Sequence, residues 1–274
     1  MRIKNYKKNS SLFLVILFSL SCSNIFAPIS QTDTDSAKYE DALKAINDSD
    51  YVAAITLIES TSSSFRADEE VIKTLAGAYA GKCGLNFIDY FNSLQSVNLS
   101  GTTLFLWFMN AWTGATTDSA ACTSSETLMK TIHPTVTGRT SDESLFMVIL
   151  GMTKMGVYLN QIADTNDDGI TDSPPFDGTN AGNSFCSATN ISDVQVAEIG
   201  AGLGIILANI GNINSSLGID LSSVTSACNA LPDPSVCQIE DEATFLAAPT
   251  SLLAVRTLLN TSGAGMTASN NPCP

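Results

Sequence analysis

Apolar residues recur at three- and four-residue spacing along most of the chain, which is the period of an α-helix with one buried face. Short clusters of Asn, Asp, Ser, Gly and Pro separate these stripes and are typical of turns and loops. Helices are expected over residues 37–46, 51–58, 71–84, 85–94, 101–114, 124–132, 141–164, 194–213, 221–230 and 242–259. The pattern predicts an all-α fold in which helical hairpins pack on long buried helices, with many residues left in loops.

The first two stripes predict a helical hairpin. Residues 47–50 interrupt the period between them and supply turn and capping side chains. One face gathers Tyr39, Ala42, Leu43 and Ile46, and the next stripe gathers Tyr51, Ala54, Ile55 and Ile58. Two such helices joined by a short turn bury their apolar faces against each other.

The packing residues of this hairpin resemble a tetratricopeptide-type repeat. The hexapeptide 50–55, DYVAAI, is similar to the acidic, aromatic, x-x-Ala-Ile opening of the family's second helix. In a looser second copy, Leu75, Ala76 and Tyr79 take the large, small and aromatic positions of the first helix, whereas Ile88 stands where the second helix usually has Ala. The resemblance implies TPR-like hairpins over residues 37–98, which either offer a peptide-binding groove or only cover the rest of the protein.

Residues 101–114 are among the most apolar of the chain, yet they are fewer than the roughly 20 that a membrane span needs. We interpret them as a buried core helix rather than as a lipid-dipping segment or an exposed aromatic face. The helix over 124–132 should end at His133-Pro134, because proline cannot continue the backbone hydrogen bonds.

Two long helices are expected to form the centre of the core. The first, over 141–164, has Ser141 as N-cap and Glu143 in its first turn. The second, capped by Asp193, carries small residues at three- and four-residue spacing, so that the first can approach it closely. A last helix should start at Asp241 or Glu242 and run to residue 259.

The sharpest motif is DTNDDGITD, residues 164–172, directly after the first long helix. Carboxylate and amide oxygens at alternate positions, with a glycine for the reversal, suit the six to eight oxygens that Ca²⁺ takes. The loop resembles those of EF-hands, dockerins and thrombospondin type 3 repeats, although Pro175 replaces the twelfth-position Glu of an EF-hand. The expected ligands are Asp164, Asn166, Asp168, the carbonyl of Ile170, Asp172 and, completing the shell, Asp177.

A structural Ca²⁺ with an affinity of about 0.1–1 mM is therefore expected in the loop 164–177. The alternative is an acidic turn stabilised by its own side chains, which binds the ion weakly or not at all.

The N-terminal residues have the form of an export signal. Arg2, Lys4, Lys7 and Lys8 precede a nine-residue apolar core that is too short for a permanent span. Ser21-Cys22 then resembles the lipobox of bacterial lipoproteins, in which the cysteine is acylated and becomes the first residue, although the family's Leu and small residue are here Ser19 and Leu20. The alternative is an ordinary signal cut after Ala27.

The lipoprotein resemblance implies a palmitate-type anchor on Cys22, and Ser23 after it resembles the outer-membrane class. Residues 1–21 would be the signal peptide, 22–36 a polar tether, 37–98 the hairpins and 99–274 a helical domain with the calcium loop. Removal of the signal leaves 9 basic and 27 acidic side chains, a net charge of −18. Such a surface argues against nucleic acid, which needs clustered cations.

Seven cysteines are present, and acylation of Cys22 leaves six, which is an even number for an oxidising compartment. The disulfide candidates are Cys83, Cys122, Cys186, Cys228, Cys237 and Cys273. Only the pair Cys228–Cys237 is singled out, because two prolines between them turn the chain back; the other pairings stay open.

Enzymatic motifs are missing from the sequence: it has neither a G-x-S-x-G elbow nor a glycine-rich phosphate loop nor H-E-x-x-H, and its one histidine, His133, is interpreted as structural. We therefore expect a non-enzymatic, lipid-anchored helical scaffold of the bacterial cell envelope that binds an envelope protein or peptide. The alternatives are a calcium-dependent surface adhesion module and a docking component of an envelope transport assembly.

Overall fold

The computed structural model describes residues 33–86, 90, 103–173, 175–176, 184–213, 221–261, 265–266 and 273. The expected signal peptide, Cys22 and most of the tether lie outside this part of the chain, as do Asp177 and most of the helix expected over 85–94. Within the described residues the regular structure is helical and contains no strand, which confirms the all-α prediction.

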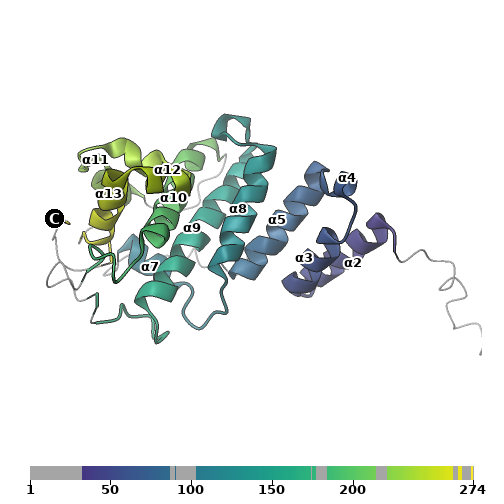
Figure 1. Ribbon diagram of the computed structural model, residues 1–274, viewed down its shortest axis with the longest axis horizontal. Helices are drawn as coiled ribbons and strands as arrows, with labels where there is room; N and C mark the ends of the chain where they lie inside the picture. The colour runs from purple at the N-terminus through teal and green to yellow at the C-terminus, as the bar shows by residue number, and fades with distance from the viewer. Residues whose placement is uncertain are drawn as a thin grey trace, which may run out of the picture.

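The helices follow one another in a row, with α2–α4 at one end, α5, α8 and α9 in the middle, and α10–α13 at the other end (Figure 1). The α-helices are α2 Asp35–Asn47, α3 Tyr51–Glu59, α4 Ser63–Arg66, α5 Glu69–Cys83, α7 Leu104–Asn110, α8 Ser119–Ile132, α9 Ser141–Ala163, α10 Asp193–Asn209, α11 Ser222–Asn229, α12 Glu242–Ala247 and α13 Pro249–Leu259. The short 3-10 helices are η1 Val136–Gly138, η2 Ile210–Asn212 and η3 Pro234–Gln238.

Helix α5 belongs to two hydrophobic cores at once. One face, with Val71 and Leu75, packs with α2 and α3 in a small core that also buries Ala42, Ala54, Ile55 and Ile58. Ala76, Ala80 and Cys83 point into a larger core shared with α7–α13. Because the two sets are offset by about half a helical turn, α5 is the wall between the hairpin layer and the rest of the protein.

The larger core is centred on α9 and α10, as the small-residue spacing predicts. A Cβ built on Gly151 of α9 would lie only 2.8 Å from the carbonyl oxygen of Gly202 in α10, so these glycines allow the two backbones to approach closely. Helix α9, and α10 together with η2, are long and apolar enough to cross a membrane, but 72% and 67% of their apolar windows are buried inside the protein. They have the burial of core helices.

Several helix ends differ from the predictions. The N-cap of α9 is Thr140 rather than Ser141, because Glu143 stands three residues after Thr140 and completes a capping box with it. The N-cap of α10 is Ser192 rather than Asp193, for the same reason with Gln195. In each case two adjacent residues are able to cap the helix, and the Glu or Gln three residues after the first of them makes that first residue the N-cap.

Three further helices have different lengths from those predicted. The apolar stretch 101–114 is helical only over α7, from its cap Thr103, although its large side chains are buried as expected. Helix α8 starts five residues earlier than position 124, where Asp118 accepts a hydrogen bond from the backbone N–H of Ala121. The expected last helix is two, α12 and α13, because Pro249 cannot continue α12.

Candidate functional site

The calcium-type loop begins at Asp164, the C-cap of α9, whose side chain is buried and turned into the loop. Its Oδ1 accepts the backbone N–H of Asp168 at 2.9 Å, and its Oδ2 accepts that of Gly169 at 3.0 Å. The Asn160 amide, one helical turn earlier, donates to Oδ2 at 3.2 Å. This carboxylate therefore shapes the loop whether or not an ion is bound.

Positive φ angles at Asp167 (59°) and Gly169 (78°) make the sharp reversal. Asp167 also accepts the backbone N–H of Gly114 at 2.7 Å, and the hydroxyl of Thr113 donates to Asp164 at 3.4 Å. The loop is thus fixed against the turn that follows α7, and its position is set by the core.

Three of the other predicted ligands, Asn166, Asp168 and Asp172, lie in the same loop as Asp164, and each has a hydrogen-bond partner within it. The Asn166 amide donates to Asp168 Oδ2 at 3.0 Å, and Asp168 Oδ1 accepts the backbone N–H of Ile170 at 2.8 Å. Asp172 accepts both the backbone N–H and the hydroxyl of Thr165, at 2.9 and 2.5 Å. An entering cation would have to replace these hydrogen bonds by turning the Asn166, Asp168 and Asp172 side chains.

A polar cavity of about 650 Å³ adjoins the loop. Thr165, Asn166, Asp168 and Asp172 line it from the loop side, and Thr189 lines it from the segment before α10. Solvent and ions therefore have access to the side chains that the motif predicts as ligands.

The six cysteine candidates form three disulfides. Cys228–Cys237 joins α11 to η3, as predicted from the intervening prolines. Cys83–Cys122 joins the end of α5 to α8, and Cys186–Cys273 joins the segment before α10 to the C-terminal residues. These two pairs close loops of 39 and 87 residues, and only the fold brings their partners together.

An apolar groove of about 310 Å³ lies where the hairpin layer meets the core. Leu43 and Ile46 of α2 line one side, Thr74 and Gly77 of α5 form its floor, and Phe146 of α9 closes it. The first stripe predicted from the sequence therefore contributes both to the small core, through Ala42, and to this groove.

A buried charged network was not predicted. Lys154 of α9 is 1% exposed, and its ammonium contacts Glu126 of α8, at 2.6 Å, and Glu198 of α10. Lys130 forms a second ion pair with Glu126 at 2.5 Å, and Thr123 donates to Glu198 at 2.9 Å. The network ties three neighbouring helices together at the centre of the larger core.

The pKa values in this network follow from burial and charge pairing. Burial opposes the charged form of Glu126, but the ammonium groups of Lys154 and Lys130 outweigh it and hold its pKa below the ordinary value of 4.5. Burial likewise opposes the charge of Lys154, yet Glu126 and Glu198 raise its pKa. The only sign of this network in the sequence is Lys154, a charged residue inside an apolar helix, and the sequence does not show which carboxylates pair with it.

Comparison with family models, with curated proteins and with solved structures gives no match.

Proposed function

We propose that this protein is an exported, lipid-anchored helical scaffold of the bacterial cell envelope, which binds an envelope protein or peptide and is braced by a structural Ca²⁺. The observation that carries the proposal is the pairing of six of the seven cysteines in three disulfides. Stable disulfides suit a compartment outside the cytosol. The seventh cysteine is Cys22, which directly follows the signal-like apolar segment and is the residue that acylation would use.

The anchor would place the hairpin layer nearest the membrane. Eleven residues lie between Cys22 and Thr34, the N-cap of α2, and the twelve steps from one to the other reach about 40 Å in a fully extended chain. Helices α2–α4 form one end of the row, so α10–α13 would lie farthest from the lipid (Figure 1).

The partner would bind in the groove lined by Leu43, Ile46 and Phe146. Its lining is mostly apolar, and an apolar groove between helices suits the apolar face of a partner helix or extended peptide. The resemblance of residues 37–98 to tetratricopeptide-type repeats, which offer a peptide-binding groove, supports the same binding site.

To test this function, the intact chain is expressed in a bacterium that processes lipoproteins, and acyl-labelled protein and cross-linked partners are recovered from the envelope. Wild type should carry the label and Cys22→Ser should not. Leu43→Lys should lose the cross-linked partner, whereas Leu246→Lys, on α12 at the far end and 39% exposed, should retain it. An unlabelled, cytosolic wild type would overturn the proposal.

Calcium is expected to raise the free energy of unfolding. At about 10 mM Ca²⁺ and the affinity expected above, the gain over chelated protein is about 1.4–2.7 kcal/mol, measured by urea unfolding. Asp168→Asn keeps an oxygen to accept the Ile170 N–H but removes one ligand charge, so the gain should shrink. Asp233→Asn, in a turn outside the loop, is the matched control. Equal unfolding curves with calcium and with chelator would contradict the site.

The polar cavity beside the loop favours a second candidate, the calcium-dependent adhesion module. The scaffold and the adhesion module differ in whether partner capture depends on calcium. If chelation lowers stability while the cross-linked partners stay the same, the scaffold is supported; if chelation abolishes partner capture from a chain that is still folded, the adhesion module is supported.

A further inference from the structure

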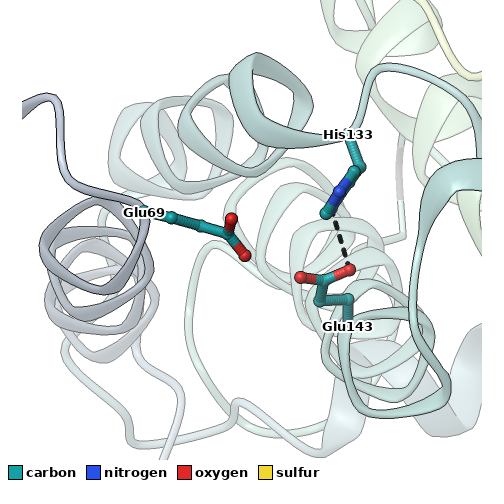
Figure 2. Close-up of side chains that lie close together, drawn as sticks. All are labelled: Glu69, His133 and Glu143. Carbon is teal, nitrogen blue, oxygen red and sulfur yellow. Dashed lines mark ion pairs between the residues drawn. The ribbon is translucent and has the colours of Figure 1, made fainter.

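Three potential metal ligands meet at the junction of the hairpin layer and the core, away from the calcium-type loop. Glu69 is the first residue of α5, His133 is the C-cap of α8, and Glu143 lies in the first turn of α9 (Figure 2). Their ligand atoms all lie within 4.8 Å of one another. The three come from separate segments of the chain, so no sequence motif connects them.

Two of the three already have a spacing suited to a metal ion. His133 Nδ1 lies 3.0 Å from Glu143 Oε2, and adjacent ligand atoms of a tetrahedral zinc site, with bonds of 2.0–2.2 Å, are about 3.3–3.6 Å apart. Glu143 is 5% exposed, and its Oε2 also accepts the backbone N–H of Thr140 at 2.8 Å. That hydrogen bond orients the carboxylate, as a supporting residue does in metal sites. Glu69 is 56% exposed at its side chain and has room to move toward the pair.

The position between the two carboxylates already holds a cation, the ammonium of Lys73. Its Nζ lies 2.8 Å from Glu143 Oε1 and 2.6 Å from Glu69 Oε1. Two carboxylates carry a charge of −2, and the single ammonium of Lys73 neutralises only half of it, whereas a doubly charged ion balances it fully.

We propose that Glu69, His133 and Glu143 bind a divalent transition-metal ion of the zinc type, which displaces the ammonium of Lys73 and keeps water in its remaining position. Imidazole together with carboxylates suits zinc, whereas Ca²⁺ prefers oxygen ligands alone. The bound ion joins α5 to α8 and α9, and thereby clamps the hairpin layer to the core. The site depends on neither the lipid anchor nor the calcium-type loop.

The test is calorimetric titration of Zn²⁺ into the full-length mature chain, purified without a histidine tag. Wild type should bind one ion, and His133→Gln should bind it at least about 10-fold more weakly, because a ligand is lost. Lys73→Met should bind about 10-fold more tightly, because the competing cation is gone. Lys44→Met removes an exposed lysine that also pairs with a carboxylate, Asp41, and should leave the affinity unchanged.

Two controls separate this site from other effects. Circular dichroism reports whether each variant is folded. If His133→Gln is unfolded, the visible spectrum of Co²⁺ bound to wild type and to Lys73→Met reports metal ligation directly. Asp168→Asn should bind zinc as wild type does, so a failure of the calcium proposal leaves this test intact. Equal zinc affinity in wild type and folded His133→Gln would overturn the proposal, as would weaker binding, or a Co²⁺ spectrum without ligand bands, in Lys73→Met.

Discussion

Replacement of Lys154 by methionine is expected to lower the free energy of unfolding by about 3–5 kcal/mol. The ammonium is buried between Glu126 and Glu198, and its removal leaves two buried carboxylates without the cation that lies between them. Lys130 still pairs with Glu126 but not with Glu198, so it cannot compensate fully. Urea unfolding near neutral pH measures the loss, with Lys44→Met on the surface as control.

A compensating variant distinguishes charge from packing. In Lys154→Met/Glu126→Gln/Glu198→Gln the two buried carboxylates become neutral, and Lys130, which loses Glu126 as its partner, has a side chain that is 24% exposed and can reach solvent. Most of the stability should therefore return. If the triple variant is as unstable as Lys154→Met, the lysine acts through the shape of its side chain, and the electrostatic account is wrong.

The same network gives a pH dependence. Since the pKa of Glu126 is lowered in the folded protein, its contribution is fully present above the ordinary value of 4.5 and is lost as the pH falls through the lower, folded value. The triple variant lacks this carboxylate, so its stability should fall less than that of wild type over the same acid range.

Removal of the Cys186–Cys273 disulfide is expected to have the second large effect. Its loop of 87 residues is the longest of the three, and chain entropy assigns it about 4.6 kcal/mol, against about 3.9 for Cys83–Cys122 and about 2.6 for Cys228–Cys237. Double Cys→Ala variants of each pair, compared by urea unfolding, should rank in that order.

The short pair is the matched control for the long one. Cys228–Cys237 lies in the same C-terminal half of the chain, and its double variant loses the same number of sulfur atoms, but this disulfide closes a loop of only 9 residues. If the Cys228→Ala/Cys237→Ala variant loses as much stability as Cys186→Ala/Cys273→Ala, loop entropy does not set the ranking.

Local signals in the sequence were sufficient for the helical class and for most helix positions. The period of apolar residues identified both long central helices, and two prolines identified the short disulfide. The capping errors were avoidable: Glu143 three residues after Thr140, and Gln195 three after Ser192, are the capping-box signal. Pro249 likewise indicates the break between α12 and α13, because proline cannot continue a helix.

Contacts between distant residues could not be predicted in the same way. Lys154 lies 28 residues from Glu126, and the hydrogen bond between them exists only because α8 packs on α9. The group of Glu69, His133 and Glu143 likewise requires three helix ends to meet. Periodicity indicates which face of a helix is buried; it does not indicate which other helix covers that face.

The two buried faces of α5 limit how this helix can change. In the span 69–83 only Glu69 and Glu70 are exposed, and the other side chains are buried or half-buried, so most substitutions there disturb one core or the other. Insertion of one residue near its middle would rotate the following residues by roughly 100°, which would turn Ala80 and Cys83 away from their places. Length variation among related chains should therefore be absent from this helix and concentrated in the loops on either side of it.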